Sequence, residues 1–193
     1  HITLDADKVA ADLEILTEED RPLIAFASWA SELKPAKHVE LERPINTRPS
    51  WMAASDELLP ENKLSKIRSI LEEEGRVAIK IPVLVRPKGD SSKERWSFFR
   101  VFIENCSGAG RRPVFLREGI VITDVRANTV SGARALVVVD DKPLAGLLGD
   151  SEGVNHTQWQ KDSEKFHGRY TYGADTINFV TRSFQEIMQR VRG

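Results

Sequence analysis

Two stretches near the middle of the chain alternate in hydropathy over a length typical of a long β-hairpin. The first has an apolar residue at every second position: Val77, Ile79, Ile81, Val83 and Val85. A turn-rich segment, residues 87–92, separates it from the second stretch, residues 95–105. Successive side chains of a strand point to opposite faces of a sheet, so this spacing predicts a hairpin with one continuous apolar face.

The second strand of this hairpin is apolar on both of its faces. One face carries Phe99, Val101 and Ile103, and the other carries Trp96, Phe98 and Phe102. We therefore expect the sheet to be covered, at least in part, on both sides. Pro82 in the first strand lacks a backbone N–H, which predicts an edge position or a bulge there.

Helical periodicity surrounds the hairpin and predicts most of the remaining elements. Val9, Leu13 and Leu16 recur at helical spacing, and further helices are expected over residues 20–31, 61–74, 143–148 and 156–166 and from residue 175 onwards. Gly75 is expected to end the helix over residues 61–74. In the final helix an apolar stripe is formed by Ile177, Val180, Phe184, Ile187 and Val191.

The predicted fold class is α+β, with a mixed, mainly antiparallel sheet flanked by helices and a helical N-terminal third. Short apolar runs predict further strands at residues 114–116, 120–122 and 135–139. Four prolines lie within residues 34–60, which are expected to form an irregular connector. The predicted organisation is therefore a helical segment with its connector, residues 1–60, and an α/β domain, residues 61–193.

Length and charge limit what the chain can be. The chain has 193 residues, 40% of them hydrophobic, enough to bury a core. Its 28 basic and 29 acidic residues nearly cancel, so no global field favours nucleic acid or an acidic membrane, although a local basic patch stays open. The single cysteine suits a reducing compartment.

The ends of the sequence add an expectation about context. The start, HITLDADK, has neither an initiator Met nor the features of a signal peptide, and no apolar run approaches the roughly 20 residues that span a bilayer. We expect a cytoplasmic piece of a longer protein that has no membrane partner.

Polar clusters follow the short strands, and Arg117-Glu118-Gly119 is the first of them. An arginine held by a short turn can aim its guanidinium at a phosphate. The alternative is a turn with a local ion pair, in which Gly119 supplies a positive φ. Turns of the second kind are common, and both interpretations stay open.

Asp140 and Asp141 form the second cluster, at the end of the most apolar strand. Adjacent carboxylates at a strand end can hold Mg²⁺, with Asp150, Glu152 and His156 as further ligands. Against this, adjacent strand residues point to opposite faces. The sequence Asp-Lys-Pro is also typical of a turn into a helix.

The segment Asn155-His156-Thr157-Gln158-Trp159 is the third cluster. Its donors suit a polar ligand, or Asn155 or Thr157 caps a helix while Trp159 packs in the core. A phosphate-binding GxxxxGK[ST] loop, an HExxH helix and a CxxC pair are all absent from the sequence. Gly108-Ala109-Gly110 begins like GxGxxG, but Pro113 occupies the third glycine position.

These clusters lie in a segment that resembles a known family. The string VFLREGI…ITDVRA…RALVVVDDKPLAGLLGDSEGVNHTQWQKDSEKF resembles the region after the ATPase domain in large bacterial GHKL-type ATP-binding proteins, which are related to gyrase B, MutL and the ninety-kilodalton heat-shock chaperone. In that superfamily a transducer domain follows the ATP site and contacts the γ-phosphate through one basic side chain. The resemblance covers roughly residues 77–166.

The resemblance implies a role for two basic residues. By position, Arg117 matches the nucleotide-phosphate sensor, and Lys142 is the second choice. It also implies a preceding ATPase domain, ATP and Mg²⁺ as cofactors of the parent protein, and a homodimer. The superfamily's ExxxN helix and DxGxG loop are absent, so the chain alone is expected to be inactive and to hold no cofactor.

Two other functions compete with this coupling role. One is a non-catalytic module that binds a protein or nucleic acid. The other is a Mg²⁺-dependent phosphoesterase that uses Asp140, Asp141 and Asp150.

Overall fold

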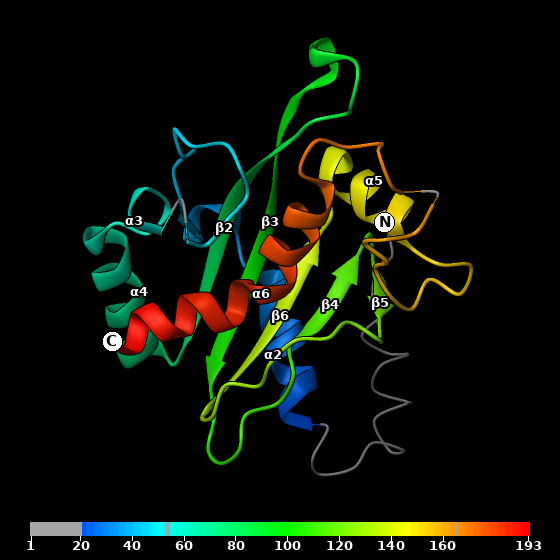
Figure 1. Ribbon diagram of the computed structural model, residues 1–193. Coiled ribbons are helices and arrows are strands. Elements are labelled where there is room, and N and C mark those ends of the chain that lie inside the picture. The colour runs from blue at the N-terminus through cyan, green and yellow to red at the C-terminus, as the bar shows by residue number, and fades with distance from the viewer. Residues whose placement is uncertain (1–20, 53–54, 165) are drawn as a thin grey trace. The chain divides into compact units, whose positions relative to one another are not determined.

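The structure is a computed structural model that describes residues 21–52, 55–164 and 166–193 (Figure 1). The chain divides into two compact units, residues 1–37 and 38–193. The described part of the first unit contains helix α2 (Arg21–Glu32) and the 3-10 turn η1 (Pro35–Lys37). Helix α2 matches the helix predicted over residues 20–31, whereas the helix predicted around Val9 lies outside the described residues.

The second unit is built on a mixed sheet. Its strands in the described residues are β1 (Val39–Glu40), β2 (Arg76–Val85), β3 (Arg95–Asn105), β4 (Val114–Arg117), β5 (Ile120–Ile122) and β6 (Ala133–Val139). They lie in the order β1-β2-β3-β6-β4-β5. The β1/β2 and β4/β6 pairs are parallel and the other pairs are antiparallel. The predicted α+β class, with a mainly antiparallel sheet and flanking helices, is confirmed.

The central hairpin has the predicted alternation. Its register runs from Arg76 opposite Glu104 to Val85 opposite Arg95, and the 3-10 turn η2 (Ser91–Lys93) lies in its loop. The odd-numbered residues from Val77 to Val85 and from Phe99 to Ile103 are buried. They form the sheet side of the core, as the period of two predicts.

Pro82 is accommodated because of its position beside the short strand β1. The Leu41 N–H donates to the Lys80 carbonyl, so the backbone polar groups of Lys80, and of Pro82 two residues later, face the β1 side. Strand β1 pairs only with Ile79 and Lys80. The N–H that Pro82 lacks is therefore missing from a nearly open edge and not from the β2–β3 ladder.

Three helices cover the face of the sheet that carries the odd-numbered residues of the hairpin (Figure 1). They are α4 (Glu61–Glu74), α5 (Lys142–Ser151) and α6 (Gly173–Arg192), and the short helix α3 (Ser55–Leu58) precedes α4. Helix α4 has the predicted bounds. Gly75 ends it with a φ of 71°, and its N–H donates to the Leu71 carbonyl.

Helix α6 packs with the predicted stripe. Ile177, Val180, Phe184, Ile187 and Val191 are all buried. Trp51 adds to this interface, because its indole N–H donates to the Phe179 carbonyl at 2.8 Å and its ring stacks on Phe179. At the other end of α6, the Arg68 guanidinium donates to the Val191 and Arg190 carbonyls, which otherwise lack helical partners.

The prediction of a helix over residues 156–166 is wrong: the described residues of this segment, 156–164 and 166, form turns, bends and an isolated bridge. His156 has a left-handed φ of 51°, which interrupts helical geometry. Trp159 forms an isolated β-bridge with Glu152, and the Gln160 N–H donates to the Ser151 carbonyl. The segment thus folds back on the end of α5.

The connector is more ordered than the proline spacing predicts. Residues 34–60 contain η1, β1 and α3, and Val39 is buried where β1 joins the sheet. The boundary between the two compact units therefore lies at residues 37 and 38. The connector belongs mostly to the unit that contains the sheet.

Replacing Phe184 by Ala is expected to lower the free energy of unfolding by about 3–5 kcal/mol, because the Phe184 side chain is fully buried between α6 and the sheet. Urea denaturation measures this loss. The matched control is Gln189→Ala on the exposed side of α6, which should change stability by less than about 0.5 kcal/mol. Equal effects would place the stripe outside the core.

Candidate functional site

The sheet brings two of the predicted polar clusters to one edge. Strands β4 and β6 are adjacent and parallel, so their carboxyl ends meet. Arg117, the last residue of β4, lies beside Val139, the last residue of β6. The Glu118 N–H donates to the Val139 carbonyl at 3.0 Å, which continues the ladder by one residue. Asp140 and Asp141 follow directly.

Arg117 is held by a buried carboxylate that the sequence analysis did not pair with it. The Arg117 Nε donates to Glu152 Oε1 at 2.5 Å, and Nη2 donates to Oε2 at 2.9 Å. The Glu152 side chain is 0% exposed and the Arg117 side chain is 11% exposed. A two-pronged contact of this kind fixes the plane of the guanidinium as well as its position.

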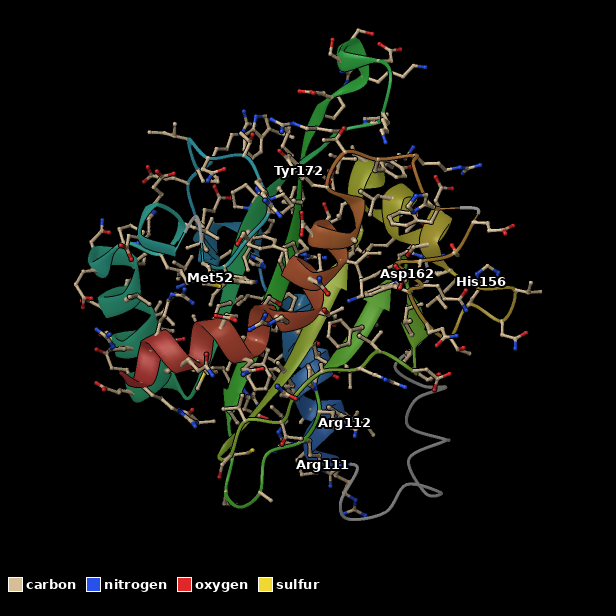
Figure 2. The ribbon with its side chains drawn as sticks, in the orientation of Figure 1. Met52, Arg111, Arg112, His156, Asp162 and Tyr172 are labelled. Carbon is tan, nitrogen blue, oxygen red and sulfur yellow. The ribbon has the colours of Figure 1, made fainter. Side chains whose placement is uncertain are left out.

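Two further donors reach the same carboxylate. Trp159 Nε1 lies 3.2 Å from Glu152 Oε1, and His156 Nδ1 lies 2.8 Å from Oε2. Trp159 is buried, as predicted, and packs edge-on against Phe115 of β4. His156 lies at the outer margin of the loop after α5, and its side chain is 60% exposed (Figure 2). Glu152 therefore joins β4, the end of α5 and the loop that follows it.

The ionisation of this pair follows from its contacts. Burial by itself raises the pKa of Glu152, but the hydrogen bonds from Arg117, His156 and Trp159 outweigh it and leave the pKa below its ordinary value. The hydrogen bond to Glu152 raises the pKa of Arg117, and burial opposes this only in part. Glu152 is therefore a carboxylate and Arg117 a cation at neutral pH.

The third contact of Arg117 faces the surface. Its Nη1 donates to Glu118 Oε2 at 2.7 Å, and the Glu118 side chain is 49% exposed. Glu118 and Gly119 have φ values of 48° and 80°, so the turn is left-handed at both positions. The local ion pair and the positive φ of Gly119 proposed from the sequence are thus both present. The contact with Glu152, 35 residues away, had no local signal.

Asp140 and Asp141 bind separate partners on different sides of the sheet, as their adjacency predicts. Asp140 pairs with Arg100 of β3. Asp141 Oδ2 accepts from the Ser97 hydroxyl at 2.6 Å, and the Ser97 oxygen accepts from the Leu144 N–H. Ser97 thereby satisfies a backbone donor in the first turn of α5, a position where such donors lack helical partners.

Asp150 has its own partners and lies apart from these contacts. It accepts from the Tyr170 hydroxyl at 2.7 Å and pairs with Arg169. Burial and this hydrogen bond raise the pKa of Tyr170 to about 12. Among the residues that the structure describes, no group of three or more His, Cys, Asp or Glu is placed to hold a metal ion.

Lys142 and Arg117 are not brought together. Lys142 is the exposed first residue of α5, and within the described ranges its side chain makes no hydrogen bond or ion pair. Arg117 packs against Gly149 in the last turn of the same helix, where an added Cβ would lie 3.5 Å from its Cζ. The two basic candidates thus differ: one is anchored and the other is free to move.

This region also contains a short glycine–serine motif that was not among the sequence predictions. Gly149-Asp150-Ser151-Glu152-Gly153 has the GxSxG spacing of a hydrolase nucleophile. The Ser151 side chain is fully buried at the end of α5, and its hydroxyl donates to the Leu148 carbonyl at 2.7 Å. A nucleophilic serine needs an exposed oxygen on a strand-to-helix turn, and Ser151 has neither feature.

Comparisons with known proteins identify no relative of this chain. No family model, curated protein or solved structure matches this chain. None of the helices in the described ranges combines the length and the apolar character needed to cross a membrane.

The Glu152 carboxylate should make stability depend on pH in the acid range. Its pKa in the folded protein is lowered, so its contribution is present above the ordinary value of 4.5 and is lost as the pH falls through the lowered value. Urea denaturation between about pH 7 and about pH 3 should show a steeper acid loss in the wild type than in Glu152→Gln.

The control for this series is Glu118→Gln, which removes a half-exposed carboxylate from the same arginine. It should follow the wild-type profile closely, because exposed ion pairs contribute little to stability. Equal slopes for the wild type and Glu152→Gln would contradict a buried, ionised Glu152.

Proposed function

We propose that this chain is the coupling domain of a larger GHKL-like ATPase, in which a basic side chain senses the nucleotide state and the domain passes it to a partner or substrate. The observation that carries the proposal is the Arg117 guanidinium at the β4–β5 turn, oriented by a buried carboxylate. The resemblance of residues 77–166 to the transducer region of that superfamily supports it.

The contacts of Arg117 suit a sensor that is oriented in advance. Glu152 takes two prongs of the guanidinium and leaves Nη1 to the half-exposed Glu118. A phosphate oxygen arriving at the turn would replace the Glu118 carboxylate at Nη1, because both offer an anionic oxygen that accepts from a guanidinium N–H. The Glu152 contact would stay in place during this exchange, so little conformational entropy is lost on phosphate binding.

The same carboxylate offers a route for passing on the signal. Glu152 also accepts from Trp159 and His156, so a movement of the Arg117–Glu152 pair as a unit would alter the contacts of the loop after α5. Trp159 in turn packs edge-on against Phe115, which lies two residues before Arg117 on β4. Phosphate binding at Arg117 would thereby bias the position of the loop after α5, because the buried Glu152 carboxylate connects the two.

In the intact protein, Arg117→Ala should lower the rate of ATP turnover by about 10²-fold while changing ATP affinity much less. The contact with the γ-phosphate would form when the domains close, so it would stabilise the transition state more than the bound nucleotide. Arg117→Lys should restore only part of the rate, since an ammonium cannot keep both the Glu152 fork and the phosphate contact. Steady-state kinetics separates kcat from KM.

Two further variants protect this test from a loss of folding. Arg117→Ala/Glu152→Gln removes the charge that a single substitution would leave unpaired in the core, and it should show the same loss of turnover. Glu118→Gln removes the anion that competes for Nη1 and should not slow turnover. A folded Arg117 variant with the wild-type rate would contradict the assignment to Arg117. Lys142→Ala then tests the exposed second candidate.

A further inference from the structure

The second face of β3 carries two half-buried aromatic rings, each accompanied by a cation. Trp96 and Phe98 are half-buried and lie on the same face, two residues or about 7 Å apart. The Arg43 guanidinium lies 5.0 Å from the centre of the Trp96 ring, and the Lys80 ammonium lies 4.6 Å from that of Phe98. Further along the strand, Arg100 lies over the ring of Phe102, which is buried.

Two of the cations on this face lie opposite one another, and each is paired with a carboxylate. Lys80 of β2 is directly opposite Arg100 of β3, so two like charges share a cross-strand pair. Such pairs destabilise a sheet. Glu40 and Asp140 offset the two charges separately, but the pairing itself contributes nothing to the core, which lies on the other face. Both cations stay partly exposed in these ion pairs, so an anionic ligand can compete with the two carboxylates for them.

A surface cavity of about 200 Å³ adjoins these groups. It is lined by Arg43, Lys80, Pro82, Trp96 and Phe98 together with Glu40, Leu41 and Ser97. The cavity thus places two flat apolar rings beside two cations, one of which, Lys80, is paired with Glu40. A ligand that satisfies both must combine planar rings with negative charge at short, regular spacing.

We propose that this surface, the β3 platform of Arg43, Lys80, Trp96, Phe98 and Arg100, binds single-stranded nucleic acid. Unpaired bases stack on Trp96 and Phe98, and phosphates pair with the three cations, as in proteins that join aromatic platforms to basic grooves. In the free protein the flexible Arg43 and Lys80 side chains cover the rings; on binding they move to the phosphates, and the bases take their place.

A single strand fits this surface better than a duplex, because duplex bases are already stacked on one another and present no free face to the rings. The proposal is independent of the coupling role. Arg117 and Glu152 belong to the face covered by the helices, and none of the platform residues contacts them in the described part of the chain. The two functions can therefore be tested by separate substitutions.

Binding is tested with the full chain and a fluorescein-labelled oligothymidylate of about fifteen nucleotides at low salt. We expect a rise in fluorescence anisotropy with a Kd of about 10⁻⁴–10⁻⁶ M and quenching of tryptophan emission. Trp96→Leu should weaken binding about tenfold. Trp96→Phe should keep most of the affinity and lose the quenching, because a stacking ring remains but the reporter does not.

The matched control for charge is Lys66→Ala, an exposed lysine of α4 on the opposite side of the sheet. Lys80→Ala should lower the slope of log Kd against log salt by about 0.7, the value for one phosphate contact with a single strand, and Lys66→Ala should leave it unchanged. Circular dichroism confirms folding of each variant.

Each of the following results would overturn the proposal. They are no anisotropy change up to the weakest affinity named, equal losses in Lys80→Ala and Lys66→Ala, and binding of the corresponding duplex as tight as that of the single strand. Thymidine monophosphate as competitor separates a mononucleotide pocket from a strand platform. If thymidine monophosphate displaces the oligonucleotide at an equal concentration, one nucleotide is the whole ligand. That result would contradict the proposal that the surface binds a strand.

Discussion

The register of the β2–β3 hairpin is the constraint on which the rest of the structure depends. A shift of β2 by one residue against β3 would turn the apolar row from Ile79 to Val85 away from the core and bring Lys80 into it. Burying a cation and removing a continuous apolar row from the core would cost more than the loss of any single contact in the fold. The register thereby determines where α4, α5 and α6 pack and which side chains remain for ligands.

The second organising contact is the carboxylate of Glu152. The described residues of the loop after α5 form no helix, and His156 among them has a left-handed conformation. Backbone bonds from Gln160 to the Ser151 carbonyl and from Asp124 to the Thr157 carbonyl hold the loop, and Glu152 adds side-chain contacts to them. Glu152 accepts from a strand residue, a tryptophan and a histidine, so a single buried charge connects β4 to this loop. A buried pair is weak evidence for stability but strong evidence for a defined orientation.

The two proposals use opposite faces of one rigid frame. Arg117 lies under α5 on the helix-covered face, and the β3 platform lies on the other face. Strands β3, β6 and β4 are consecutive in the sheet, and Asp140, which follows β6, pairs with Arg100 of the platform. A nucleotide-dependent change at the end of β4 would therefore have a short path, through hydrogen-bonded strands, to a ligand on the platform.

The sequence by itself determined the elements whose signal is local. The alternation in β2 and β3, the stripe of α6 and the left-handed Gly75 are each set by periodicity or by one residue's backbone freedom, and they were predicted correctly. The opposite directions of Asp140 and Asp141 follow from the same geometry. Only the tertiary structure decided that Glu152 meets Arg117, that the described residues between 156 and 166 are not helical, and that Lys80 faces Arg100. Those outcomes depend on contacts between distant segments, where burial of a charge or of Trp159 outweighs helix propensity, and no pattern within a short window carries that information.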